Sequence, residues 1–284
     1  KFISAHRHGQ GNGTGGPGGF TAATFTDTSD ALDQALFYRA SKVTEVTSGY
    51  AVIPPATLPL SPRNVYRWQL RPVGDPSGNS DLFIYSMHLA SSDAAQRAAQ
   101  TTDVRSNADS LPAGSNIICV GDFNIDSSSE TSYQHFIEAP DSTGRMYDPI
   151  NSPGSWTDNA TFSLIHTQSA HKDNNTPESP APAGTSIGGL DDRFDFLLIS
   201  APLKNGAGID YIAGTYQAFG NDGQHLNIDI NDPPTIPEGV TIADALHASS
   251  DHLPVYLDLR TGRLRGDFNA NGAVASVAIA PSTS

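Results

Sequence analysis

The stretch Asn116–Ile125, read as NIICVGDFNI, constrains the fold of this chain more than any other. Its first half is an unbroken apolar run, IICV, which is typical of a strand buried on both faces. A glycine ends the run, and Asp122 and Asn124 follow on either side of Phe123. If the extended backbone continues, its alternation places the carboxylate and the carboxamide on one face. The stretch therefore predicts either a polar site at the end of a buried strand or an Asp/Asn turn.

The charge of the chain weakens the prediction of one class of function, the binding of nucleic acid. Its 284 residues include 16 Lys and Arg against 30 Asp and Glu, for a net charge of −14. Such a field repels a polyanion at long range, which counts against a DNA-binding module. It counts less against a metal-dependent enzyme, because bound divalent cations reverse the local charge. No apolar stretch approaches the roughly 18–20 residues needed to span a bilayer, so we expect no membrane span.

The single cysteine, Cys119, lies inside the buried run. We expect a small core side chain there rather than a catalytic thiol. Other segments on both sides of the run carry regular patterns, and a strand–helix–strand order predicts an α/β unit. The expected strands are Asn64–Leu70, Asp81–Leu89, Arg193–Ser200 and Val255–Leu259, and a helix is expected from Ser91–Asp93 to Leu111.

Polar residues stand at the ends of the apolar strands. They are His88, Asp122 with Asn124, Asp195 within RFDFLLIS, and Asp251–His252 before PVYLDL. Each alone has an ordinary explanation: Asp195, for example, can form a buried pair with Arg193. Together they supply two histidines, three carboxylates and an amide, a set suited to metal-assisted hydrolysis. One carboxylate binds a hard cation, another activates water, and a histidine stabilises or protonates the charged group.

In this order, the motifs HL, GDFN, RFDFLLIS and SDHLPV resemble those of the endonuclease/exonuclease/phosphatase superfamily. The resemblance covers roughly residues 30–260. It implies an α/β (α+β) fold, a four-layer sandwich of two mainly antiparallel sheets packed face to face and flanked by helices. It also divides the chain into a glycine-rich segment of a truncated domain (residues 1–29), the superfamily domain (30–260) and a tail (261–284).

The resemblance assigns roles on the phosphate side of the site. His88 matches the family histidine that contacts the scissile phosphate. Asp122 matches the aspartate that orients or deprotonates the attacking water. Asn124 matches the amide that helps to hold the phosphate or that aspartate.

The resemblance also implies a second group of residues and a metal. Asp195 matches the acid that positions a catalytic histidine, and His252 is that histidine. Asp251 matches a carboxylate of the metal site, which Asp122 shares. The implied reaction is in-line attack of water on a phosphorus ester, with Mg²⁺ or Mn²⁺ neutralising the developing charge.

The chain departs from the family pattern upstream. Family members carry an early strand that ends in asparagine, then a strand with a glutamate that is the principal metal ligand. Nothing upstream of Asp30 matches either motif. Glu45 is the first glutamate and Glu130 the next, and the context of Glu45 differs from that of the family. We expect the chain to start downstream of these motifs, with the first strands absent and weaker metal binding as a result.

Gly266–Asn269 repeats the letters GDFN, but a basic segment precedes it instead of a buried strand. Asp267, Asn269 and Asn271 match the opening of a dockerin-like or EF-hand calcium loop. The twelfth position is Ala278, where a carboxylate is needed, so only weak Ca²⁺ binding is expected, with a disordered tail as the alternative. Tails of this kind are typical of secreted or cell-surface proteins.

The sequence thus predicts a divalent-metal-dependent phosphoesterase that hydrolyses phosphodiesters in the manner of a nuclease, with nucleic acid among the candidate phosphate-ester substrates. A phosphomonoesterase or phospholipid hydrolase of the same fold is an alternative. A catalytically inactive extracellular interaction domain is the alternative from another class.

Overall fold

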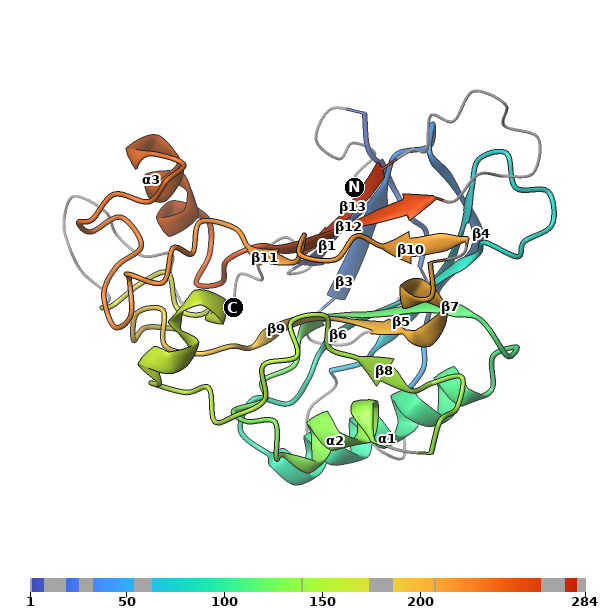
Figure 1. The fold of residues 1–284 in the computed structure, drawn as a ribbon, viewed down its shortest axis with the longest axis horizontal. Helices are drawn as coiled ribbons and strands as arrows, with labels where there is room; N and C mark the ends of the chain where they lie inside the picture. The colour runs from blue at the N-terminus through green and yellow to red at the C-terminus, as the bar shows by residue number, and fades with distance from the viewer. Residues whose placement is uncertain are drawn as a thin grey trace.

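Two mixed β-sheets stacked face to face form the centre of the computed structural model (Figure 1). The structure describes residues 2–7, 19–25, 33–53, 63–138, 140–173, 186–206, 208–261 and 274–279, with backbone alone at 2–7, 33, 261 and 274–279. In the described part, no helix is long and apolar enough to cross a membrane.

One sheet has seven strands in the order β10-β12-β13-β1-β3-β2, with β11 paired to β12. All pairings in it are antiparallel except that of β1 with β13. Its strands are β1 (Phe2–Arg7), β2 (Thr21–Ala22), β3 (Asp33–Tyr38), β10 (Ile209–Tyr211), β11 (Gln217–Ala218), β12 (Val255–Thr261) and β13 (Val274–Ile279).

The other sheet has six strands in the order β4-β5-β6-β7-β9-β8, and only β6 and β7 are parallel. Its strands are β4 (Val43–Ala51), β5 (Tyr66–Pro72), β6 (Leu82–His88), β7 (Asn116–Asp122), β8 (Met146–Tyr147) and β9 (Asp195–Ser200). The β6–β7 connection carries a helix because parallel neighbours need a crossover of a dozen or more residues.

That crossover helix is α1 (Ala94–Asp109). The side chain of Asp93 caps it by accepting the backbone N–H groups of Ala95 and Gln96 at 2.9 and 3.0 Å. Helices α1 and α2 (Thr131–Ile137) lie along the outer face of the six-stranded sheet, whereas α3 (Val240–Ser249) stands among loops at one end (Figure 1). Two short 3₁₀ helices, η2 (Ala160–Ile165) and η3 (Ala201–Lys204), complete the elements.

Strand β7 separates two apolar cores. Ile118 and Val120 pack into the core between the two sheets, while Ile117 and Cys119 pack against the helix side. All seven residues of β7 are buried, as the unbroken apolar run predicts, and Cys119 is a buried core side chain. A third, smaller apolar cluster joins α3 to the neighbouring loops.

The predicted fold class is confirmed: two mainly antiparallel sheets pack face to face with flanking helices. In the described residues, α1 and α2 cover one sheet, and α3 sits at the loop end (Figure 1). The segments placed outside the predicted central domain also add strands: β1 and β2 from residues 1–29, and β13 from residues 261–284. The calcium-loop candidates Asp267, Asn269 and Asn271 lie outside the described residues.

Candidate active site

Three neighbouring strands carry three of the predicted site residues in one row. His88 of β6 is paired with Asp122 of β7, and Asp122 is paired with Asp195 of β9. Directly opposed residues project from the same face of a sheet. This is the face that, further along β7, supplies the core between the two sheets. The row therefore ends the inter-sheet core with one imidazole and two carboxylates.

Asp122 is the centre of this row. Its Oδ2 lies 3.3 Å from Nε2 of His88 and 3.7 Å from Nε2 of His252, so two imidazoles approach one oxygen. Its Oδ1 accepts the backbone N–H of Asn124 at 2.9 Å. The structure thus brings three predicted residues, His88, Asn124 and His252, around the buried carboxylate of Asp122.

His252 is held by Asp195. Nδ1 of His252 lies 2.7 Å from Oδ2 of Asp195, which leaves Nε2 facing Asp122. The loop before β12 fixes the backbone, since His252 N–H donates to Ser250 Oγ at 3.0 Å. Thr167 Oγ1 accepts the N–H of Asp195 at 3.1 Å. The carboxylate therefore sets which ring nitrogen of His252 points into the site.

Two buried groups of the site, Asp122 and His252, have strongly shifted pKa values. Burial, together with the nearby charge of Asp195, raises the pKa of Asp122 to about 7, although His252 opposes the shift. Burial alone would lower the pKa of His252, but Asp195 and then Asp122 and Asp251 outweigh it and raise that pKa to about 10. Near neutral pH, His252 is protonated and Asp122 is close to its titration point.

The backbone after β7 turns instead of continuing as a strand. The strand ends at Asp122, and Asn124 has a φ of +50°, a left-handed conformation that asparagine tolerates. The expectation that Asp122 and Asn124 share a face through continued alternation is therefore wrong. The turn brings them together because the Asn124 backbone N–H caps Asp122, while its Nδ2 donates to the Leu89 carbonyl at 3.0 Å.

Asp251 is buried beside His252, but its carboxylate has other partners. Its Oδ2 accepts the backbone N–H of Ser186 at 2.7 Å. Its negative charge raises the pKa of both His252 and His171, so it acts electrostatically on both imidazoles. Its predicted role as a metal ligand stays a prediction.

Arg63, which the sequence analysis missed, adds a positive charge to the site. Its guanidinium donates to the Leu89 carbonyl at 2.8 Å, the same oxygen that Asn124 uses. Its charge lowers the pKa of Asp122, whereas burial lowers the pKa of Arg63 itself. Gln100 of α1 accepts the N–H of Ala90 and donates to the Arg63 carbonyl, at 3.0 and 2.8 Å. The only sequence signal for Arg63 was its position directly before the predicted strand Asn64–Leu70.

Gln168 is the other missed residue. Its side-chain amide lies 2.6 Å from Nε2 of His252. Because the protonated imidazole donates from Nε2, the amide oxygen of Gln168 is the group that accepts this hydrogen bond. Gln168 lies in a loop whose sequence shows no periodic pattern, so no sequence signal marks it.

The pairing of Asp195 with Arg193, considered as an alternative from the sequence, is not what the structure shows. Arg193 donates two hydrogen bonds to Asp148, at 2.8 and 3.0 Å, and its guanidinium lies over the ring of Phe196. Arg193 lies before β9, which begins at Asp195. The carboxylate of Asp195 contacts His252 instead, with Oδ2 at 2.7 Å from Nδ1 of the imidazole.

One group of three His, Cys, Asp or Glu side chains in the described residues can hold a metal ion, and it lies away from Asp122, at His171, Asp229 and His247. Asp122 is a buried carboxylate, the type of oxygen ligand that a hard cation prefers. Mg²⁺ is usually bound through one or two carboxylates with several waters.

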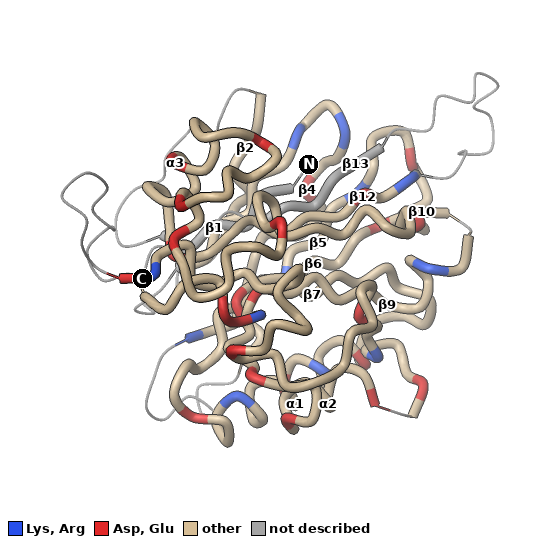
Figure 2. Tube along the Cα trace, turned by 60° about the vertical axis from the view of Figure 1, so that its left-hand side comes forward, with Lys and Arg blue, Asp and Glu red and all other residues tan. Residues whose placement is uncertain are grey.

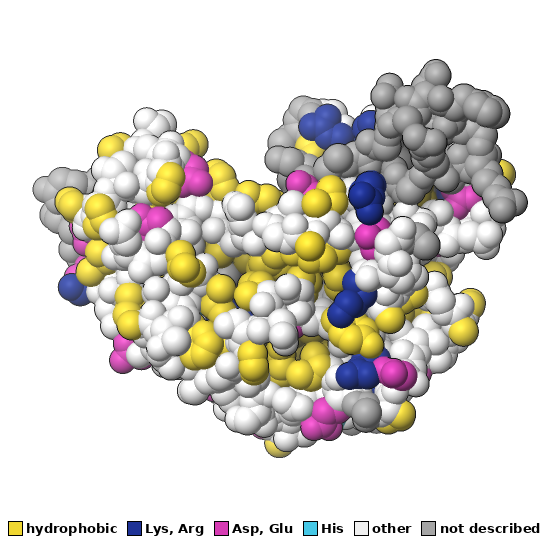
Figure 3. All heavy atoms as spheres, viewed as in Figure 1, with side chains coloured by type: hydrophobic (Ala, Val, Ile, Leu, Met, Phe, Trp, Pro, Cys, Tyr) yellow, Lys and Arg dark blue, Asp and Glu magenta, His cyan; other side chains and the backbone are white. Residues whose placement is uncertain are grey.

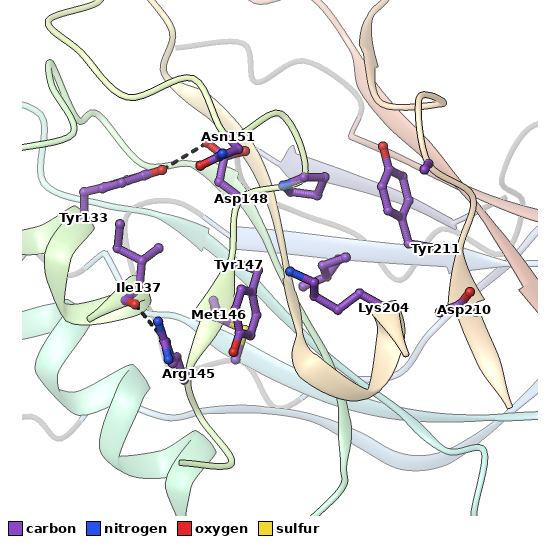
Figure 4. Close-up of a pocket in the computed structure, with 13 residues that line it drawn as sticks. Tyr133, Ile137, Arg145, Met146, Tyr147, Asp148, Asn151, Lys204, Asp210 and Tyr211 are labelled. Carbon is purple, nitrogen blue, oxygen red and sulfur yellow. Dashed lines mark hydrogen bonds between the residues drawn. The ribbon is translucent and has the colours of Figure 1, made fainter. Parts of the chain in front are cut away.

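A separate cavity of about 630 Å³ lies between β8, η3 and β10. Figure 4 shows Tyr147, Lys204 and Tyr211 around it, with Arg145 at one edge. None of the predicted site residues lines it.

On the face drawn in Figure 3, hydrophobic side chains gather along the middle, and most of the Lys and Arg side chains lie to the right. Around α3, several acidic and few basic positions appear (Figure 2).

Comparison with known proteins supports the fold. No family model matches the sequence, and no curated protein matches it. Solved structures do match: an endonuclease/exonuclease/phosphatase family protein from Bacteroides thetaiotaomicron has 17% identity and a TM-score of 0.51, over 85% of this chain and 75% of that one.

Two further matches have similar scores. D. rerio TDP2 in complex with a single-strand DNA product is 15% identical with a TM-score of 0.53, over 86% of this chain and 78% of that one. A mannosyl-6-phosphatase from B. thetaiotaomicron is 16% identical with a TM-score of 0.50, over 85% and 77%. The chain thus has the fold of the endonuclease/exonuclease/phosphatase superfamily, as its motifs imply.

Proposed function

We propose that this protein is a divalent-metal-dependent phosphoesterase that hydrolyses phosphodiesters. The observation that carries the proposal is the arrangement at Asp122, where two imidazoles face one buried carboxylate and a second carboxylate holds one of them. The fold supports it, since solved proteins of this fold include a phosphatase and TDP2 bound to a DNA product.

The residues divide the work of in-line water attack. Asp122 would orient the attacking water and accept its proton, and its raised pKa in the metal-free protein makes it a stronger base than an ordinary aspartate. Protonated His252, held by Asp195, donates a proton to the leaving oxygen, so the products are an alcohol and a phosphate monoester. His88 supplies a ring N–H donor, and Arg63 supplies a positive charge, beside the phosphate oxygens.

Asp122 would hold Mg²⁺ or Mn²⁺, with Asp251 as the second proposed carboxylate. When bound, the cation neutralises charge on the phosphate. The proton donor serves a diester and a monoester alike, because both release an alcohol whose oxygen a group such as His252 can protonate.

The test is hydrolysis of bis(4-nitrophenyl) phosphate with Mg²⁺ or with EDTA. We expect Mg²⁺-dependent turnover that Asp122→Ala lowers by about 10²–10⁴-fold. Asp222→Ala is the matched control, because Asp222 also pairs with a buried histidine, His225, at 2.9 Å outside the site. Absence of turnover dependent on both Mg²⁺ and Asp122 would overturn the proposal.

The same assay separates the alternatives. Faster hydrolysis of 4-nitrophenyl phosphate would indicate a phosphomonoesterase, and activity confined to sphingomyelin vesicles would indicate a phospholipid hydrolase. A folded protein that is inactive on all three substrates would favour an interaction domain. We also propose an extracellular location on the basis of the dockerin-like tail, and detection of the protein only in the cell interior would contradict it.

A further inference from the structure

A second cluster of side chains that can bind a metal lies next to the loop that carries Asp251 and His252. Nδ1 of His171 is 3.1 Å from Nε2 of His247, and the same Nε2 is 3.5 Å from Oδ1 of Asp229. The three ligand atoms all lie within 4.8 Å of one another. His247 comes from α3, and the other two come from the loops before β9 and before α3. Three segments distant in sequence therefore meet at one point.

We propose that His171, Asp229 and His247 bind one transition-metal ion of the zinc type. Two ligands about 2.0–2.1 Å from a tetrahedral ion lie about 3.3 Å apart. The observed spacings of 3.1 and 3.5 Å lie on either side of that value. Two imidazoles with one carboxylate suit Zn²⁺, whereas Mg²⁺ and Ca²⁺ prefer oxygen ligands.

The surroundings hold the three side chains in place. His171 and His247 are 0% and 3% exposed, and the two rings meet edge to face with centroids 4.2 Å apart. Oδ1 of Asp229 accepts the backbone N–H of Lys172 at 2.6 Å, which orients the carboxylate towards the histidines. With three protein ligands, water completes the coordination.

The ion would fasten the loops that position His252. His247 precedes Asp251 by only four residues, at the end of α3. Ala170, next to His171, donates its N–H to the Asp251 carbonyl at 3.1 Å and accepts the N–H of Ile230, next to Asp229, at 3.1 Å. The small apolar cluster that includes Ala170 and Ile230 also connects these segments. The ion would thus act by connecting these loops, at a site distinct from the proposed cation at Asp122.

The experiment titrates the EDTA-treated protein with Co²⁺ in excess Mg²⁺ and records the visible absorption of the cobalt. We expect one Co²⁺ per chain, displaced by Zn²⁺, and a melting temperature several degrees higher with Zn²⁺ than with EDTA. Asp229→Asn and His247→Gln should each weaken Zn²⁺ binding by at least about tenfold. His225→Gln is the control, since His225 is equally buried but lies outside the cluster.

Two results would overturn the proposal: no Co²⁺ or Zn²⁺ bound in excess Mg²⁺, or unchanged affinity in both cluster variants. The three side chains would then form only a hydrogen-bonded network. If His247→Gln does not fold, Asp229→Asn decides alone, because its side chain is 14% exposed and its amide keeps the same shape. The readouts are independent of catalysis, so they hold whether or not the protein proves to be a phosphoesterase.

Discussion

Nδ1 of His252 lies 2.7 Å from Oδ2 of Asp195, and their side chains are only 3% and 5% exposed. This contact joins two chain segments 57 residues apart, the first residue of β9 and the loop before β12. A buried imidazole next to a carboxylate favours the protonated form. The pair therefore sets the charge as well as the direction of His252, and it can be tested directly.

Asp195→Asn should lower the pKa of His252 well below 10. The variant keeps the shape of the side chain but removes the charge that does most to raise that pKa. Titration of the histidine Cε1–H signals by NMR in the metal-free protein measures the shift, and turnover should fall by about 10²–10⁴-fold. Asp222→Asn is the control and should leave the His252 signal in place. An unchanged His252 titration in Asp195→Asn would contradict the assigned role.

Binding of Mg²⁺ should weaken as the pH falls below about 7. The pKa of Asp122 is raised to about 7, so protons compete with the cation for this carboxylate. For one competing proton, the apparent affinity falls about tenfold per pH unit below the pKa. Calorimetric titration of the protein with Mg²⁺ between pH 5.5 and 8 measures this dependence. An affinity that stays constant over the range would exclude Asp122 as the ligand.

Asp122→Asn should stabilise the metal-free protein at pH 8. A folded-state pKa raised from 3.8 to about 7 means that stability falls as the pH rises through this window, because ionisation of the buried carboxylate is unfavourable. The amide removes that cost, and we expect a gain of about 0.5–2 kcal/mol in the free energy of unfolding. Urea denaturation in EDTA measures it, and the gain should vanish near pH 4. A loss of stability at pH 8 would contradict the prediction.

Much of the site could be predicted because its residues sit on regular elements. His88 and Asp122 are the last residues of their apolar strands, and Asp195 is the first residue of its strand. The strand pairing places the three in one row. Arg63 and Gln168 could not be found this way. They lie in irregular segments, where no period relates sequence to direction, and only tertiary contacts bring them to Leu89 and His252.

The turn at Asn124 shows the same limit in a short segment. Its letters fit both a continued strand and an Asx turn, and only its φ of +50° decides between them. The overall layers were predicted from the family resemblance, whereas the strand and helix patterns alone predict an α/β unit with a fully apolar strand covered on both faces. The register that places Asp122 opposite Asp195 could not be predicted. A strand pattern determines which face of the sheet a side chain is on, but it does not determine which strands pair.

Arg193 and Asp148 form a buried ion pair that should matter for stability rather than chemistry. Their side chains are 0% and 4% exposed and make two hydrogen bonds. Asp148→Ala leaves the guanidinium buried without its partner, so we expect a loss of about 3–5 kcal/mol in the free energy of unfolding. Urea denaturation measures the loss. Arg145→Ala is the control, since its partner Asp141 is 80% exposed, and it should cost under about 1 kcal/mol. Equal losses in both variants would contradict the assignment.

Gly121 should tolerate no side chain, because β6 runs directly beside it. Its φ is +140°, and a Cβ built there would lie 1.8 Å from the Met87 carbonyl oxygen. Met87 and Gly121 are paired across the parallel strands, one position before His88 and Asp122. Gly121→Ala therefore must push β6 and β7 apart exactly where these two side chains meet.

We expect Gly121→Ala to lower the free energy of unfolding by about 2–4 kcal/mol, through overpacking and an unfavourable backbone conformation. Gly114→Ala is the matched control. It also has a positive φ, +84°, but nothing lies within 4 Å of its Cβ position, so only the conformational cost of about 1 kcal/mol applies. Comparing the two by urea denaturation isolates the steric part, and similar losses would show that β6 does not approach β7 this closely.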